Sequence, residues 1–127
     1  MPLLRIGRCA LFFVIAAGLF TGCGPKSIKP PSPLSEAEIP GALEKAFAKG
    51  VPELKDSANQ IVAAVQAKDY SKAFNTLQSL SGREGLSNEQ IEIINRALLT
   101  VRGLLQTAEA QGDQKAAQTI QLYHTKK

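Results

Sequence analysis

Histidine and cysteine are scarce in this chain of 127 residues, which has one histidine, His124, and two cysteines, Cys9 and Cys23. Protein metal sites usually combine several histidine, cysteine or carboxylate side chains at close spacing. Ser-His-Asp and Cys-His catalytic arrangements need a histidine held beside a nucleophile. A single histidine without neighbouring ligands is more typical of a solvated side chain. We therefore expect no metal, no cofactor and no enzymatic activity.

Two further patterns for catalysis or ligand binding find little support. Glu36 and Glu38 would be close enough for an acid–base pair, but carboxylates in the first turn of a helix are favoured by the helix dipole, so we interpret both as structural. The segment 82–85, Gly-Arg-Glu-Gly, lacks the lysine and the hydroxyl group that phosphate-binding loops use. We expect no phosphate site in this loop.

Acidic residues are absent before Glu36, whereas Arg5 and Arg8 stand near the beginning of the sequence. An apolar stretch of 12 residues follows, from Cys9 to Phe20. A helix needs about 20 apolar residues to cross the hydrocarbon core of a bilayer, so a permanent transmembrane anchor is the weaker interpretation. A basic segment followed by a short apolar core is typical of a secretory signal. We predict a signal-peptide helix within residues 1–22.

The residues that end this stretch, Leu19-Phe20-Thr21-Gly22-Cys23, resemble the lipobox of bacterial lipoproteins, with Phe20 where that family usually has leucine. The resemblance implies cleavage between Gly22 and Cys23 and attachment of acyl chains to Cys23. The alternatives are an uncleaved anchor and an ordinary secretory signal that leaves Cys23 as a free thiol. Because Cys9 would leave with the signal, that thiol would be unpaired in an oxidising compartment, a problem that lipidation removes.

The expected location is a bacterial cell membrane, on its periplasmic or extracytoplasmic side. Two or more acyl chains on Cys23 would hold the protein on the bilayer, since each buried methylene contributes about 0.8 kcal/mol. Gly24 follows the cysteine, whereas the best-known enterobacterial sorting rule uses aspartate there to retain lipoproteins in the inner membrane. The glycine therefore favours the outer membrane.

A nucleic-acid partner is not expected. Tryptophan is absent, aromatic residues make up 6% of the chain, and no run of basic residues occurs. The formal net charge of +4 includes Arg5 and Arg8, which the signal peptide would carry away. A nucleic-acid-binding surface needs a clustered basic patch, commonly beside aromatic side chains.

Four prolines fall between Gly24 and Leu34. Proline removes backbone N–H donors and favours an extended, polyproline-like form. We predict that residues 23–34 form the lipidated cysteine and a linker. At about 3.1 Å per residue, this linker would reach roughly 30 Å and hold the folded domain away from the membrane.

Residues 35–127 are predicted to form an all-α domain, because apolar residues recur at spacings of three and four. A short helix is expected from residue 36 or 40 to 49. Further helices are expected over 52–67, from a cap at Asp69 to Ser81, over 87–111 with a capping box of Ser87 and Gln90, and from Asp113 onward. We expect Gly82 to end its helix in the left-handed conformation and Gly103 to allow close approach of a neighbouring helix.

Asp69 and Asp113 each follow an apolar helix at a tight turn and are 44 residues apart. We predict that each begins the second half of an antiparallel helical hairpin, with Ala73 and Ala117 at corresponding positions. Two such hairpins could close as a small bundle or leave a groove open to a partner, and both arrangements are retained as hypotheses.

The first hairpin resembles tetratricopeptide-type repeats at Tyr70, Ala73 and Leu77. The spacing of the two turns exceeds the 34 residues of that family. In the second hairpin, Gln114 stands where the tyrosine is expected. The resemblance implies a helical-hairpin architecture, either a small bundle or a tetratricopeptide-like stack.

Two function hypotheses follow. The first is a lipid-anchored, non-enzymatic binding or scaffold domain that holds another envelope protein or a peptide against its helices. The second is a structural envelope lipoprotein that forms a homo-oligomer through the long helix over residues 87–111. The apolar stripe of that helix extends over about three heptads, the lower limit for a coiled coil.

Overall fold

The computed structural model describes residues 29–127. These residues form five helices and no strand, so the described part of the chain is all-α, as predicted. The predicted signal helix and the beginning of the predicted linker lie outside the described residues. The helices are α1 (Glu38–Phe47), α2 (Pro52–Gln66), α3 (Tyr70–Ser81), α4 (Asn88–Ala110) and α5 (Gln114–Thr125).

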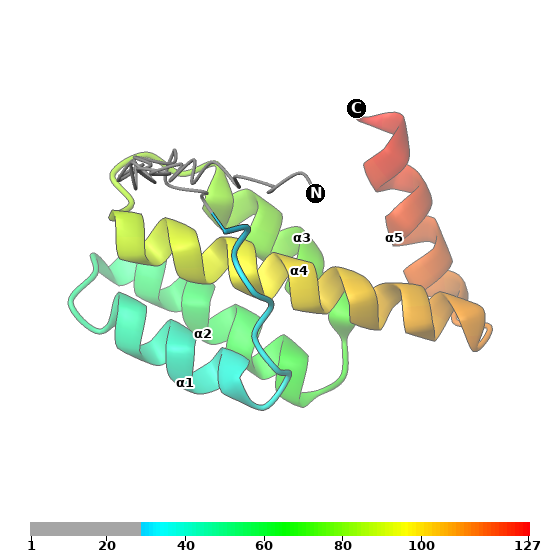
Figure 1. Ribbon diagram of the computed structural model, residues 1–127, viewed down its shortest axis with the longest axis horizontal. Coiled ribbons are helices and arrows are strands. Elements are labelled where there is room, and N and C mark those ends of the chain that lie inside the picture. Colours follow the sequence, from blue (N-terminus) through cyan, green and yellow to red (C-terminus); the bar gives the residue numbers. More distant parts are fainter. Residues whose placement is uncertain (1–28) are drawn as a thin grey trace, which may run out of the picture.

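Helices α1 to α4 form a closed bundle (Figure 1). Helix α1 packs against α2 and α4, while α3 packs against the other sides of α2 and α4. The predicted small bundle is therefore observed, but α1 rather than α5 completes it with α2, α3 and α4. The largest fully buried side chains come from all four helices: Ile39, Leu43, Phe47, Ile61, Leu77, Leu80, Ile94, Val101 and Leu105.

Helix α5 lies outside this ring and packs against α3 and α4 only. Figure 1 shows it projecting away from the far end of α4. None of the five helices is long and apolar enough to span a bilayer.

Helix α1 begins at Glu38, between the two expected starts. The Glu38 carboxylate accepts a hydrogen bond of 2.8 Å from the Ser35 backbone N–H, which is half of a capping box. Pro40 is the third residue of the helix, and its missing N–H costs nothing there because first-turn N–H groups have no intrahelical acceptor. The proline is thus compatible with an earlier start than its own position.

The turn between α2 and α3 is a Schellman motif. The Asp69 N–H donates to the Ala64 carbonyl at 2.9 Å, and the Lys68 N–H donates to the Val65 carbonyl at 3.0 Å. Lys68 is left-handed, with φ of 59°. The Asp69 side chain then caps α3 by accepting the Lys72 N–H at 3.1 Å, as the sequence predicted.

The turn between α4 and α5 repeats this arrangement. The Asp113 N–H donates to the Ala108 carbonyl at 3.0 Å, and the Gly112 N–H donates to the Glu109 carbonyl at 2.9 Å. Gly112 is left-handed, with φ of 93°, and Asp113 caps α5 through the Ala116 N–H. The two predicted turns therefore share one hydrogen-bonding pattern.

The start of α4 also agrees with the prediction. The Ser87 hydroxyl accepts the Gln90 N–H at 3.2 Å, and the Gln90 side-chain oxygen accepts the Ser87 N–H at 2.9 Å. The Gln90 amide group also donates to the Ala46 carbonyl of α1 at 3.2 Å. The capping box therefore joins α4 to α1 as well as starting the helix.

Two expectations about glycines were wrong. Gly82 has φ of −87°, because α3 ends in a tighter turn in which the Arg83 N–H donates to the Leu80 carbonyl, and the left-handed residue of this loop is Gly85. Gly103 is exposed, and an added Cβ would meet no atom within 4 Å. No neighbouring helix therefore packs closely against Gly103.

Residues 29–37, which we call the N-terminal strap, cross the outer side of α4 (Figure 1). The Arg96 side chain donates to the Ser32 carbonyl at 2.8 Å, and the Thr100 hydroxyl donates to the Leu34 carbonyl. Leu34 is 6% exposed and belongs to the core. The end of the predicted free linker is thus part of the folded domain, because its last apolar side chain finds a buried site.

Candidate functional site

The second half of α5 is the part of this helix least covered by the bundle. Its first two turns place Ala116 and Thr119 against α3 and α4, and both are buried. Leu122, one turn further, is 61% exposed. Helix α5 therefore leaves an open space on each side of its C-terminal half.

The space on one side is a groove between α3 and α5 with a volume of about 490 Å³. Polar side chains of α3 form one wall, and the other wall combines apolar and basic groups of α5. The lining residues are Asn75, Gln78, Ser79, Thr119, Leu122, Tyr123 and Lys126. We call this space the α3–α5 groove.

A smaller pocket of about 100 Å³ lies between α4 and α5. Its apolar part comes from Phe74, Leu105 and Ile120, and its basic part comes from Arg102, His124 and Lys127. Gln106 and Tyr123 complete the lining. We call this space the α4–α5 pocket, and together with the α3–α5 groove it forms the α5 site.

Tyr123 separates the two spaces and lines both. Its ring packs edge-on against Phe74, with centroids 5.4 Å apart and an interplanar angle of 83°. The Lys127 ammonium group lies 4.9 Å from the centroid of the Tyr123 ring. Interaction with Lys127 lowers the pKa of Tyr123, and the charge of Arg102 adds to this effect. Two cations therefore converge on one phenol group.

The cations around the α5 site have no carboxylate partner. All aspartate and glutamate side chains of the chain belong to residues 29–127, since none precedes Glu36. The ion pairs in this part of the chain are Lys68–Glu36 and Lys115–Asp69. No carboxylate side chain lines either space of the α5 site, although Glu109 lines an adjoining hollow that shares Gln106, Ile120 and His124 with the α4–α5 pocket. The site is therefore cationic around a partly apolar floor.

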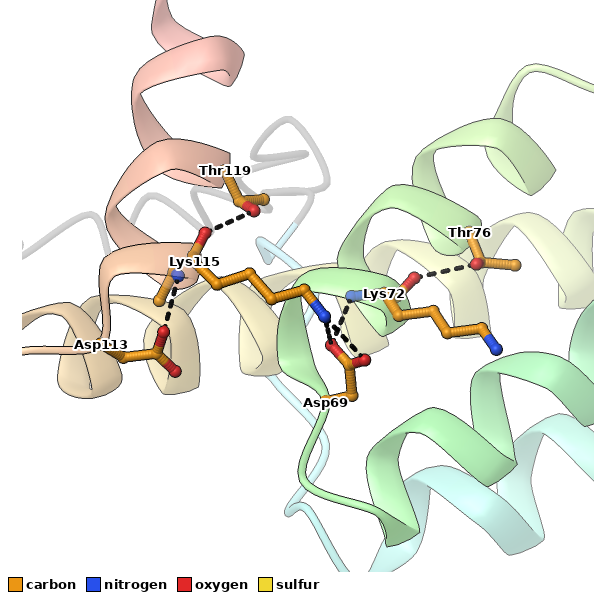
Figure 2. A network of polar contacts seen from close by, with 7 residues as sticks. Asp69, Lys72, Thr76, Asp113, Lys115 and Thr119 are labelled. Carbon is orange, nitrogen blue, oxygen red and sulfur yellow. Dashed lines mark hydrogen bonds and ion pairs between the residues drawn. The ribbon is translucent and has the colours of Figure 1, made fainter.

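Asp69 connects the base of α5 to the turn between α2 and α3 (Figure 2). The Lys115 ammonium group donates to both Asp69 carboxylate oxygens at 2.9 Å, while the same carboxylate caps α3 through the Lys72 N–H. The Lys115 hydrogen bond lowers the pKa of Asp69 below its usual value of 3.8, with the Lys72 N–H as the second cause. The predicted turn residue thus also contacts the first turn of α5.

Tyr70, also selected from the sequence, connects the same turn to the N-terminal strap. Its hydroxyl donates to the Glu36 carboxylate at 2.8 Å, and Lys68 donates to the same oxygen at 2.5 Å. These hydrogen bonds lower the pKa of Glu36, with Lys68 as the larger cause, and burial raises the pKa of Tyr70. Glu36 and Glu38 therefore each hold a separate structural contact, because Glu38 bonds to Ser35.

These pKa shifts predict a loss of stability in acid. The pKa values of Glu36 and Asp69 are lower in the folded chain than their usual 4.5 and 3.8. The unfolded chain therefore binds protons first, and the stabilisation is lost as pH falls below about 4.5 through the lowered values. We expect Asp69→Asn, which keeps the cap, to lower the free energy of unfolding at pH 7 by up to about 1 kcal/mol and to flatten its decline toward pH 3. Urea unfolding at both pH values measures this.

Asp56→Asn is the matched control, because Asp56 is exposed and has no ion-pair partner among residues 29–127. It should leave the decline toward pH 3 close to that of the unmodified chain. Equal pH profiles for Asp69→Asn and the unmodified chain would contradict a role for the Lys115 contact in acid stability.

The remaining selected residues divide into two groups. Gly22 and Cys23, predicted to flank the cleavage bond, lie outside the described residues. Ala73 is fully buried, but Ala117 is only half-buried, and its neighbour Ala116 occupies the buried position. The buried alanine of α5 is therefore the third residue after its capping aspartate, whereas that of α3 is the fourth.

Several residues of the α5 site were not selected from the sequence. Arg102 and Lys127 stand 25 positions apart, and no local pattern relates them. Arg102 lies on α4 and Lys127 follows the end of α5, so no helical periodicity relates them either. In residues 29–127, no three His, Cys, Asp or Glu side chains lie close enough to hold a metal ion, and no buried side-chain nitrogen or oxygen lacks a hydrogen-bond partner.

No protein-family model matches this chain, and the searches of curated proteins and of solved structures return no match.

Proposed function

We propose that this chain is a non-enzymatic, lipid-anchored protein of the bacterial cell envelope whose helical domain binds a protein or peptide partner at the α5 site. The lipid anchor rests on the lipobox-like segment that ends at Cys23. The binding role rests on the helical domain, and the favoured location is the outer membrane.

One observation carries the binding role: Leu122 is 61% exposed beside a groove of about 490 Å³. A single exposed apolar side chain is ordinary on a protein surface. Leu122 differs because it adjoins a concave surface and neighbours Tyr123, which lines both the groove and a second pocket. The α4–α5 pocket has the apolar lining with a few polar groups that is usual for ligand sites, and the α3–α5 groove adds a more polar surface beside it.

The alternative, self-association through residues 87–111, meets an obstacle in the bundle. The apolar stripe of α4 contains Ile94, Ala97, Val101 and Leu105, and all four are buried against the other helices. Pairing this stripe with a second copy would require the bundle to open. We therefore place partner binding at α5.

A pull-down from detergent-solubilised membranes tests the proposal. We expect the unmodified chain to enrich a partner and Leu122→Asp to reduce its recovery about tenfold, because an interface residue at the centre of a contact commonly contributes more than 1 kcal/mol. Val51→Asp is the matched control, since Val51 is 59% exposed in the loop between α1 and α2 and lines neither space of the α5 site.

Leu122→Asp is at an exposed position and should leave the thermal midpoint of unfolding nearly unchanged, whereas Val51→Asp supplies the acidic N-cap that α2 lacks and should raise the midpoint. Equal recovery of the same proteins by Leu122→Asp and the unmodified chain would exclude the α5 site. The absence of any enriched protein would count against a binding function.

A further inference from the structure

We propose that the partner of the α5 site is an acidic peptide segment that places one apolar side chain in the α4–α5 pocket and its carboxylates against Arg102, Lys126 and Lys127. This inference rests on the proposed binding function and deepens it by naming the chemistry of the partner.

Charge complementarity is the first argument. The α4–α5 pocket brings Arg102 and Lys127 together without a carboxylate side chain, and Lys126 lines the adjoining groove. Within residues 29–127 only Lys68 and Lys115 form ion pairs, so what distinguishes Arg102 and Lys127 from the other unpaired cations is that both line one pocket. Like charges that converge without a counterion repel one another, and an anionic partner would relieve this repulsion.

The form of the two spaces is the second argument. The α4–α5 pocket, at about 100 Å³, is smaller than the roughly 300–1,000 Å³ usual for small-molecule sites. It is closer to the size of one side chain. The α3–α5 groove, at about 490 Å³, continues beyond Tyr123 and offers room for the neighbouring residues of a peptide.

The position of the cations is the third argument. Arg102 belongs to α4, the longest helix of the bundle, so its backbone is held by the core rather than by a loop. A guanidinium group can donate two parallel hydrogen bonds to one carboxylate. Phe74, Leu105 and Ile120 line the same pocket, so an apolar side chain beside that carboxylate would contact them.

Selection from a peptide-display library on the full chain in detergent tests the inference. We expect enrichment of peptides that contain two or more Asp or Glu residues next to Leu, Ile or Phe. In fluorescence polarisation with an enriched peptide, Arg102→Glu and Lys127→Glu should each weaken binding about tenfold. The matched control Arg83→Glu should not, since Arg83 is exposed in the loop after α3 and lines neither space.

The outcomes separate this inference from the function on which it rests. Neutral or basic enriched peptides, or binding that is unchanged in both charge variants, would overturn the acidic partner while leaving a binding role in place. Equal selection by the unmodified chain and by Leu122→Asp would exclude the α5 site, on which both proposals rest, and the absence of any enriched peptide would count against the binding role itself. If the charge variants weakened only association with phosphatidylglycerol vesicles and not peptide binding, the cations would face a membrane and the inference would be wrong.

Discussion

Cys23→Ser is expected to abolish acyl labelling of the chain and its association with membranes. Under the proposed cleavage before Cys23, the thioether-linked lipid would be the whole anchor, because the apolar stretch from Cys9 to Phe20 would leave with the signal. Two or three acyl chains bury enough methylene groups, at about 0.8 kcal/mol each, to make membrane binding effectively permanent. Their loss should therefore move the protein fully to the soluble fraction. Labelling with an alkyne fatty acid, followed by membrane fractionation, measures both effects.

Cys9→Ser is the matched control. Cys9 lies within the apolar stretch of the predicted signal, so this variant should retain the label and the membrane association. A mature chain that keeps its first 22 residues, or that carries an unmodified Cys23 in mass spectrometry, would contradict the lipoprotein assignment.

Leu34→Ala is expected to lower the free energy of unfolding by about 2–4 kcal/mol, because removal of a buried leucine side chain loses its transfer free energy and leaves a cavity. Leu34 is 6% exposed and belongs to the core cluster, although it precedes the first helix. A leucine in a solvated linker would tolerate the same change at almost no cost. Urea unfolding of the full chain, followed by circular dichroism, gives the difference.

Leu122→Ala provides the comparison, since it makes the same chemical change at a site that is 61% exposed. Its effect should remain within about 0.5 kcal/mol of zero. If Leu34→Ala were equally mild, the strap would contribute little to the stability of the bundle.

Local features could be predicted well from the sequence. The capping residues Asp69, Ser87 and Asp113 accept the expected backbone hydrogen bonds, because a cap depends on residues within one turn. The apolar stripe predicted for α4 is buried at Ile94, Val101 and Leu105, since periodicity reports which face is covered, but its first member, Ile91, is 43% exposed. The fold class followed from these two kinds of signal.

Contacts between distant parts of the chain could not be predicted in the same way. The Thr100 hydroxyl bonds to the strap 66 residues earlier, and Lys115 bonds to Asp69 across 46 residues. Proline content indicated an extended strap but not the surface on which it lies. The α5 site could not be predicted for the same reason, because Arg102 and Lys127 are distant in sequence and meet only where α4 and α5 pack together.

The contacts of the strap have a mechanical consequence. Under the proposed anchor, five residues lie between Cys23 and Lys29, so the tether beyond the described strap reaches roughly 20 Å. A partner that pulls on the domain would load the strap first. The hydrogen bonds from Arg96 and Thr100 and the buried Leu34 would resist that tension before any helix unwound. The domain would therefore be attached to the bilayer through the strap that crosses α4, its longest helix.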